Sequence, residues 1–239
     1  MSRRVRYGLL LGLLSFGFLG FAWFFGQSAY TLPVALLFAW ATLAFQAVAT
    51  AYLTAEPRLF GKTPDGRLPT LRALLLGPYL ALAWAVRDLL ITSRTDEAPW
   101  HEVGPGLYLG RYLKRASALP PGTTCVVDLT CEMSKIPGLD PSVEYLVAPA
   151  LDGSLPAPAE LDRLVTLLTP KDGVLYVHCA AGHGRSAVVC AALLVTRGLV
   201  ADVPAAIERL QSLRPLVSMN PDQRAELART ARVVRAASR

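Results

Sequence analysis

Nine consecutive residues in the second half of this 239-residue chain combine the groups needed to hold and attack a phosphate. They read His178-Cys179-Ala180-Ala181-Gly182-His183-Gly184-Arg185-Ser186. An apolar, strand-like run precedes Cys179, and a helical pattern follows Arg185. Gly182 and Gly184 permit backbone angles that turn successive N–H groups inward, and the start of a helix adds partial positive charge. The segment therefore predicts an anion-binding loop from Ala180 to Arg185, with the Arg185 guanidinium gripping two phosphate oxygens.

Cys179 lies at the base of this predicted loop, where the positive field lowers a thiol pKa from about 8.5 toward neutrality. A thiolate facing phosphorus predicts in-line attack on a phosphate monoester, followed by hydrolysis of the cysteinyl-phosphate. Ser186 would donate a hydrogen bond to the thiolate as it leaves. Taken singly, Cys179 is also compatible with an inert buried thiol and Arg185 with a surface arginine. Their joint spacing between a strand and a helix favours catalysis.

The reaction also needs a general acid, because an alkoxide or phenolate is a poor leaving group. Asp152, 27 residues before Cys179, lies in a loop flanked by glycine and proline. Asp128 and Asp140 are the alternatives, and an Asp-Gly pair alone is equally typical of a turn. These residues leave the choice open.

The remaining histidines and cysteines indicate no metal site and no cofactor. The chain has three histidines and no second cluster at ligand spacing that could join Cys179 and His183. We expect His178 to brace the backbone of the cysteine. Cys125 and Cys190 are expected in the core, whereas Cys131 could form a disulfide that protects Cys179 from overoxidation.

Alternating strand and helix patterns after residue 100 predict an α/β domain with a central sheet flanked by helices. The helix after Asn220 has a plausible N-cap and a proline at its first position. The expected strands cover residues 106–110, 124–129, 145–148 and 174–178, and the expected helices cover residues 157–168, 186–197, 203–213 and 221–234.

The first quarter of the chain is very different, because the 49 residues from 7 to 55 contain no Asp, Glu, Lys or Arg. This run predicts a transmembrane helical hairpin with spans at roughly 8–25 and 32–53. A cleaved signal peptide is the alternative, but a second apolar segment follows at once. The 14 apolar residues from 73 to 86 are short for a span, so we expect an interfacial or broken helix, with a third crossing as the alternative.

Basic residues flank the apolar segments, whereas the turn between the two spans is uncharged. Both ends of the hairpin are therefore expected on the cytoplasmic side of the membrane. The net charge of +6 is not concentrated on one element, which argues against a nucleic-acid partner. Four cysteines in so long a chain are typical of reduced, cytosolic thiols. The predicted organisation is two transmembrane helices in 1–56, a linker in 57–100 and a catalytic domain in 101–239.

The signature formed by His178, Cys179, Arg185 and Ser186 resembles that of the dual-specificity branch of the cysteine-dependent protein tyrosine phosphatases. The similarity covers roughly residues 103–230. It implies that Asp152 is the general acid and that the segment from Arg214-Pro215 to Asn220 supports the phosphate loop.

The family resemblance implies a phosphate monoester as substrate, and the predicted membrane anchor favours a substrate located at the bilayer. A phospholipid head group and a phosphoprotein (Tyr, Ser or Thr) are the two candidates for a membrane-anchored phosphatase. A catalytically weak phosphate-binding module is the alternative function. Because Ala180 is neutral and no lysine lies in the loop, a highly phosphorylated head group is not favoured.

Overall fold

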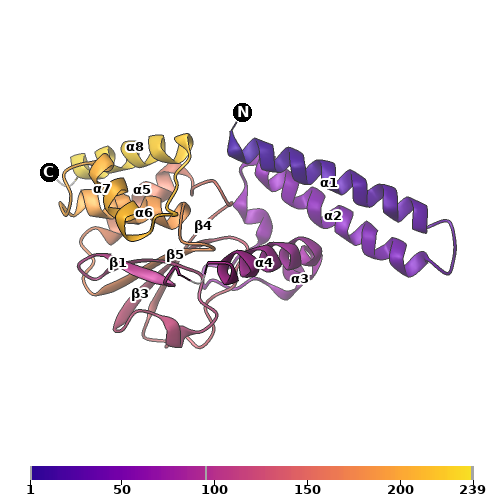
Figure 1. Ribbon diagram of the computed structural model, residues 1–239, viewed down its shortest axis with the longest axis horizontal. Coiled ribbons are helices and arrows are strands. Elements are labelled where there is room, and N and C mark those ends of the chain that lie inside the picture. The colour runs from indigo at the N-terminus through magenta and orange to yellow at the C-terminus, as the bar shows by residue number, and fades with distance from the viewer. Residues whose placement is uncertain (1, 95, 238–239) are drawn as a thin grey trace. The chain divides into compact units, whose positions relative to one another are not determined.

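The computed structural model describes residues 2–94 and 96–237, which form two compact units. The first unit comprises Met1–Thr63 and Leu68–Ser93, and the second comprises Pro64–Arg67 and Arg94–Arg239. Figure 1 shows the helices of the first unit and the sheet and helices of the second. Residues 94–100, which the sequence assigns to a linker, belong to the second unit.

The first unit is built on a helical hairpin of α1 (Arg3–Phe25) and α2 (Leu32–Thr54). Small residues allow the two helices to approach: a Cβ atom on Gly8 would lie 2.8 Å from Leu53 Cγ. The buried Ser15 hydroxyl donates to the Gln46 side-chain oxygen at 2.8 Å across the interface. Small residues and an interhelical hydrogen bond are typical of helices that pack within a membrane.

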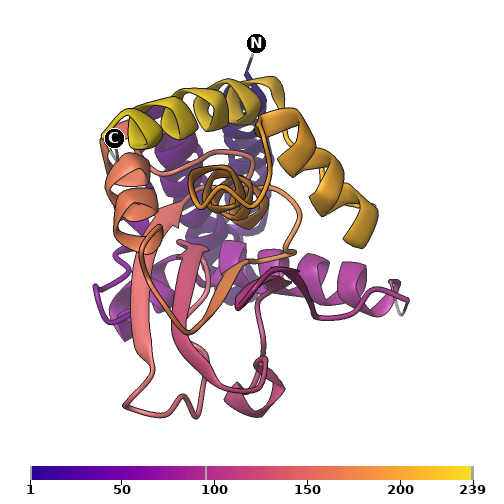
Figure 2. The ribbon, with the colours of Figure 1, turned by 90° about the vertical axis from the view of Figure 1, so that its left-hand side faces the viewer.

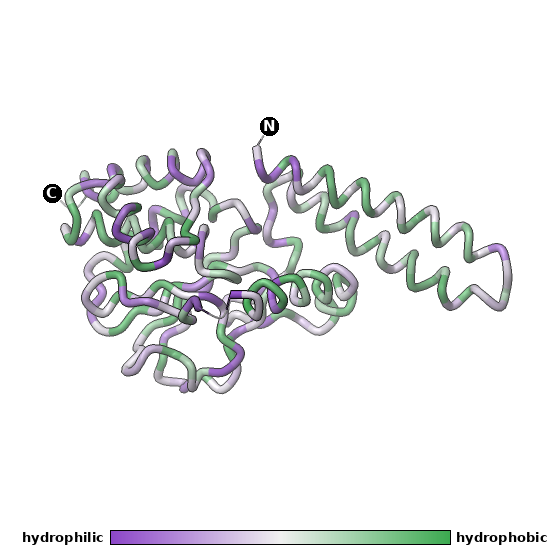
Figure 3. Tube along the Cα trace, in the orientation of Figure 1, coloured by the Kyte–Doolittle hydropathy of each residue, from purple (hydrophilic) through white to green (hydrophobic). Residues whose placement is uncertain are grey.

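Most of the surface of this hairpin is apolar and exposed. Leu13 is 71% exposed, Phe16 67% and Trp23 72%, and Figure 3 shows both helices as largely hydrophobic along their length. By length and composition, α1 and α2 are each sufficient to cross a membrane. α2 contains no Asp, Glu, Lys or Arg, and α1 contains none after Arg6, so the long exposed faces of both helices carry no charge.

The third apolar segment forms two helices rather than one, α3 (Thr70–Leu75) and α4 (Gly77–Thr92). Leu76 separates them, and the Trp40 indole N–H of α2 donates to the Leu74 and Leu75 carbonyls at 3.0 and 3.2 Å. Gly77 packs on the same indole, since a Cβ there would lie 2.7 Å from Trp40 Cζ2. The segment is therefore a broken helix that packs on the hairpin. A short 3₁₀ helix, η1 (Pro57–Phe60), precedes it.

The second unit contains a five-stranded mixed sheet in the order β1-β2-β5-β3-β4. Only β1 is antiparallel to its neighbour; the other three pairings are parallel. The strands are β1 (Trp100–Gly104), β2 (Leu107–Arg111), β3 (Thr123–Thr130), β4 (Glu144–Ala150) and β5 (Val174–Cys179). The helices are η2 (Ala116–Ala118), α5 (Pro158–Leu168), α6 (Arg185–Thr196), α7 (Val203–Leu213) and α8 (Pro221–Ala237).

The α-helices of the second unit cover one face of the sheet, as Figures 1 and 2 show. Leu175, Val177 and Cys179 of β5 face α6 within the main core, whereas Tyr176 points to the opposite face. A smaller cluster with Leu113 and Ile136 covers that opposite face. The prediction of an α/β domain with a central sheet flanked by helices is thus confirmed.

The sequence predicts four of the five strands, and β1 is the one it misses. The segment Trp-His-Glu-Val-Gly lacks regular alternation of polar and apolar residues. β1 is an edge strand, and three of its five residues are not buried. The parallel strands β3, β4 and β5 end at the same edge of the sheet. Open parallel sheets bind their ligands at this edge.

Candidate active site

The loop between β5 and α6 curls around the sulfur of Cys179. The Cys179 side chain is buried, and its Sγ accepts hydrogen bonds from the Gly182 N–H and from the Ser186 hydroxyl, each at 3.3 Å. Gly182 has a φ of +79°, and a Cβ there would lie 2.7 Å from the Gly110 carbonyl. A glycine is therefore required at position 182 for both conformation and space.

The environment of Cys179 favours its thiolate. Burial alone raises the pKa of this thiol, but the Arg185 charge, the Ser186 hydroxyl and the N–H groups of Ser186 and Gly182 lower it below the ordinary value. Hydrogen bonds and positive charge stabilise the ionised form, whereas burial stabilises the neutral one. At Cys179 the hydrogen bonds and the Arg185 charge outweigh burial, so the pKa of the thiol is lowered.

Arg185 is the first residue of α6 and is almost fully buried, at 1% exposure. Nη1 donates to the Ala150 carbonyl at 2.8 Å, and Nη2 donates to Glu132 Oε1 at 2.7 Å. Among the described residues, Nε has no hydrogen-bond partner. Gly184 precedes α6 and provides no side-chain cap hydrogen bond, and the Ser186 N–H at this end of the helix stabilises the Cys179 thiolate. An unpartnered guanidinium Nε and a helix N-terminus without a side-chain cap both suit an anion.

Glu132 is a member of the site that the sequence analysis misses. It lies two residues after β3, its side chain is 8% exposed, and it faces the Arg185 guanidinium with both oxygens. Burial raises the pKa of Glu132, but Arg185 outweighs it and holds this pKa below the usual range. The signal available in the sequence was the position of Glu132, an acidic residue two residues after the apolar run that forms β3.

Of the three aspartates considered as the acid, Asp152 alone lies beside Arg185. Its Oδ1 is 3.4 Å from Arg185 Nη2, and its side chain is 65% exposed. Asp128 is fully buried and accepts hydrogen bonds from Thr130 and from the Tyr145 hydroxyl. Asp140 forms an exposed turn with Ser142.

Asn220, predicted to support the phosphate loop, lies immediately before α8. Its side-chain Nδ2 donates to the Gly153 carbonyl at 2.7 Å, next to Asp152. Asn220 and Gln223 also cap α8 reciprocally. The buried Gln223, which the sequence analysis misses, donates to the Ser154 carbonyl and packs against Gly184. These two residues therefore hold the Asp152 loop, and Gln223 also contacts the phosphate loop.

The remaining predicted residues surround the same loop. Ala180 accepts a backbone hydrogen bond from Tyr112, Ala181 is half-buried, and the His183 carbonyl accepts one from Ser218. His178 is buried against the Tyr176 ring, 3.9 Å from the Asp128 carboxylate. All four cysteines are free, and the Cys131 thiol donates to Glu132 at 3.4 Å. Across residues 2–94 and 96–237, no group of three or more His, Cys, Asp or Glu side chains is placed to hold a metal ion.

Comparison with known proteins places this geometry in a family. Residues 115–239, more than half of the chain, match the family described as Swiss Army Knife protein, DSP-PTPase phosphatase domain. The chain is similar to phosphatidylglycerophosphate phosphatase PTPMT2 of Arabidopsis thaliana, with 39% identity over 87 residues. That alignment covers 34% of this chain and 37% of the relative, so the chain spans well under half of the curated relative's length.

Solved structures with a similar fold include human DUSP28 and PTPMT1 in complex with PI(5)P. DUSP28 aligns with a TM-score of 0.49 and 24% identity, over 58% of this chain and 96% of its own. PTPMT1 aligns with a TM-score of 0.49 and 20% identity, over 59% of this chain and 99% of its own. The match of the family to residues 115–239, which include the whole Cys179–Ser186 loop, establishes that this chain belongs to the DSP-PTPase phosphatase family.

Proposed function

We propose that the protein is a membrane-anchored, cysteine-dependent phosphatase that hydrolyses a phospholipid carrying one phosphate monoester. The observation that supports this most directly is the Cys179 sulfur, held by two hydrogen bonds in a loop whose Arg185 Nε is free for a ligand. A buried cationic nitrogen without a partner is costly unless an anion binds it. A phosphate dianion supplies that anion.

The proposed reaction has two steps. In the first, the Cys179 thiolate attacks phosphorus, an S–P bond forms and the P–O ester bond breaks, while Asp152 protonates the departing oxygen. In the second, water attacks the cysteinyl-phosphate, Asp152 takes a proton from that water, and the thiolate leaves as the S–P bond breaks. Ser186 stabilises the thiolate by its hydrogen bond, and Arg185 holds two oxygens of the phosphoryl group.

Asp152 suits the acid–base role because it combines exposure with proximity to Arg185. At 3.4 Å from the guanidinium, its carboxyl group borders the place where a bound phosphate would contact Arg185. The Asn220 bond to Gly153 and the Gln223 bond to Ser154 restrain the loop that carries it. A general acid must be positioned within hydrogen-bond reach of the leaving oxygen, and such restraints position it.

The hairpin supports a lipid substrate. Its exposed apolar faces and the length of α1 and α2 fit insertion in a membrane, with residues 1–56 as anchor and the second unit as catalytic domain. An active site fixed at a membrane meets lipid head groups at high local concentration. The similar Arabidopsis protein is named a phosphatidylglycerophosphate phosphatase, which fits a head group with one phosphate monoester.

The test compares substrates on the full chain in detergent. We expect turnover of phosphatidylglycerophosphate to exceed turnover of phosphotyrosine, phosphoserine and phosphothreonine peptides by at least tenfold in kcat/KM. Cys179→Ser is expected to abolish turnover and to retain binding of tungstate, whereas Arg185→Lys is expected to impair both, because an ammonium lacks the planar fork. Faster turnover of peptides would assign a phosphoprotein substrate, and absence of turnover on all substrates would leave a phosphate-binding module.

A further inference from the structure

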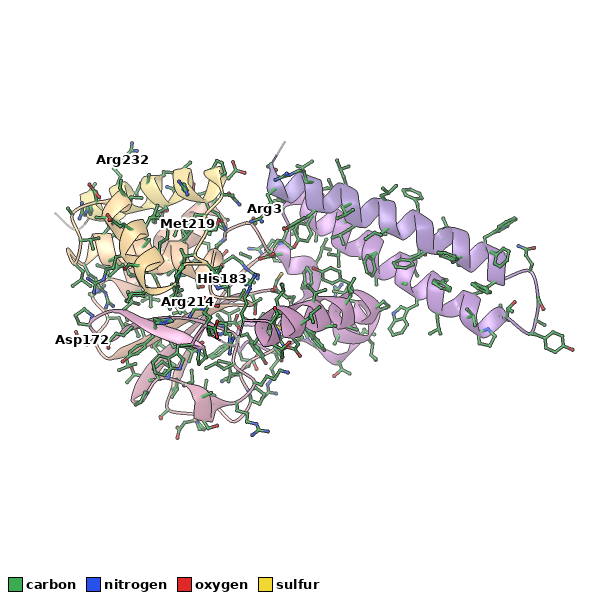
Figure 4. All side chains as sticks on the ribbon, in the orientation of Figure 1. Arg3, Asp172, His183, Arg214, Met219 and Arg232 are labelled. Carbon is green, nitrogen blue, oxygen red and sulfur yellow. The ribbon has the colours of Figure 1, made fainter. Side chains whose placement is uncertain are left out.

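A carboxylate from outside the phosphate loop holds the side chain of His183. The two oxygens of Glu97 lie 2.7 and 2.9 Å from His183 Nε2, and Glu97 Oε1 lies 3.0 Å from Arg214 Nη2. Glu97 is 11% exposed, His183 14% and Arg214 fully buried. Figure 4 shows His183 and Arg214 next to each other. The cluster is too deeply buried to be an ordinary surface ion pair, which contributes little.

The groups around His183 determine which of its two ring nitrogens carries the proton. Burial lowers the pKa of His183, Arg214 and Arg94 lower it further, and the Glu97 carboxylate raises it less than these influences lower it. His101, whose Nδ1 lies 3.2 Å from Arg214 Nη1, also has a lowered pKa, caused by burial and by Arg214. The pKa of His183 therefore lies below its ordinary value. A neutral imidazole that faces a carboxylate through Nε2 must carry its proton on Nε2.

His183 is held on its backbone as well, next to the residue that contacts the nucleophile. Its carbonyl accepts a hydrogen bond from the Ser218 N–H at 3.0 Å. The preceding residue, Gly182, donates its N–H to Cys179 Sγ at 3.3 Å. A displacement of His183 therefore changes the direction of a donor that stabilises the thiolate.

We propose that Glu97 is a positioning residue of the phosphatase: by fixing the Nε2–H form of His183 and bridging to Arg214, it keeps the Gly182 N–H aimed at the Cys179 sulfur. This inference rests on the proposed cysteine chemistry. Glu97 touches neither the sulfur nor the anion-binding donors in the described contacts, so it acts through His183. The residue lies in the segment just before β1, outside the loop signature and outside residues 115–239 that match the family.

The direction in which the Cys179 thiol pKa shifts distinguishes this positioning role from a simple effect of charge. Removing a negative charge near a thiol lowers the thiol pKa, because the thiolate loses a repulsive neighbour. Releasing the Gly182 N–H from the sulfur raises the thiol pKa, because the thiolate loses a donor. Positioning by Glu97 therefore predicts an upward shift in Glu97→Ala, opposite to the shift that electrostatics alone would cause.

The experiment measures the rate of Cys179 alkylation by iodoacetamide against pH, by peptide mass mapping of the full chain in detergent. We expect the apparent thiol pKa to rise by about one unit in Glu97→Ala, a tenfold loss of thiolate below the pKa. The shift is expected to be smaller in Glu97→Gln, whose amide oxygen still accepts from His183. The matched control is Glu102→Ala in β1, which removes a carboxylate that contacts the Gly106 N–H rather than the loop.

A double-mutant cycle tests whether the effect passes through His183. If it does, Glu97→Ala is expected to have no further effect on the thiol pKa in a His183→Ala background. An unchanged or lowered thiol pKa in both Glu97→Ala and Glu97→Gln, or fully additive effects in the cycle, would overturn the proposal. Thiol titration needs no turnover, so it tests Glu97 even if no substrate is hydrolysed and the proposed function fails.

Discussion

Cys179 differs from the other thiols of the chain in what surrounds its sulfur. Burial raises the pKa of Cys125 to about 12, and burial also raises the pKa of Cys190 well above the ordinary range. Lys171 lowers the pKa of Cys125, and Arg197 and Arg214 lower that of Cys190, but in both residues burial outweighs these charges. The pKa of Cys179 is lowered, because Arg185 and three hydrogen bonds outweigh its burial.

This contrast predicts selective chemistry in the full chain. At pH 7, iodoacetamide is expected to modify Cys179 and to leave Cys125 and Cys190 unmodified, because the thiolate is the reactive form. Because the folded pKa is depressed, the reactivity of Cys179 is retained as the pH falls below about 8.5 and is lost only below its own pKa. Mass mapping of labelled peptides between pH 5 and 9 measures this. Equal labelling of Cys179 and Cys190 at pH 7 would contradict it.

The role of Asp152 as general acid can be tested with phosphate monoesters whose leaving groups differ in how readily they depart without a proton. If it protonates the departing oxygen, Asp152→Asn is expected to slow hydrolysis of an alkyl phosphate by about 10²- to 10⁴-fold, the usual contribution of a general acid. An activated aryl phosphate leaves without help and is expected to lose much less. The alkaline limb of the kcat profile, where the carboxyl must hold its proton, is expected to flatten in the variant.

A matched control for this variant is available in the same unit. Asp140→Asn removes an exposed carboxylate that accepts hydrogen bonds from the Ser142 N–H and hydroxyl, and it is expected to leave both rates unchanged. Equal losses on alkyl and aryl substrates in Asp152→Asn, with an unchanged alkaline limb, would reduce Asp152 to a loop residue.

At the scale of elements, the active site depends on a link between the end of β3 and the start of α6. Glu132 follows β3 and binds Arg185, the first residue of α6, through both of its oxygens. Both side chains are almost fully buried. A buried ion pair of this kind is strongly destabilising when one partner is lost, because the other charge remains without compensation.

Glu132→Gln is therefore expected to lower the free energy of unfolding by up to about 3–5 kcal/mol, the range for broken buried pairs. Tungstate is expected to restore more stability to the variant than to the wild type, because the bound anion neutralises Arg185. Thermal unfolding of the full chain with and without tungstate measures both effects. Equal stabilisation of the two proteins would show that Glu132 does not balance the Arg185 charge.

The sequence predicts the elements well because their apolar patterns are local. The run before Cys179 and the helix after Arg185 have the expected positions within one residue. Glu132, Gln223 and Glu97 escape prediction because each acts through a contact with a residue at least 39 positions away in the chain. Neither spacing nor composition records such contacts. Asn220 shows the same limit, since its N-cap role is local and its bond to Gly153 is not.

At the scale of the whole molecule, the distribution of basic residues predicts the topology of the anchor. Arg3, Arg4 and Arg6 lie at the N-terminal end of α1, four basic residues from Arg58 to Arg72 follow α2, and the turn between the helices has no charge. Positive residues remain on the cytoplasmic side. A reporter fused after Arg239 is therefore expected to be active in the cytoplasm. Activity only on the outer side would require that residues 73–86 cross the membrane.

The second unit is built from two separate segments of the chain, Pro64–Arg67 and the residues from Arg94 onward. The Gly66 carbonyl accepts a hydrogen bond from the Lys135 N–H at 2.7 Å, and Gly66 packs against the Tyr145 ring. No single truncation can excise this unit intact: a fragment starting at 94 lacks the Gly66 contact, and one starting at 101 also lacks Glu97 and the first residue of β1. Expression of an isolated domain therefore calls for a circular permutant or a fusion that restores residues 64–67, rather than a simple N-terminal deletion.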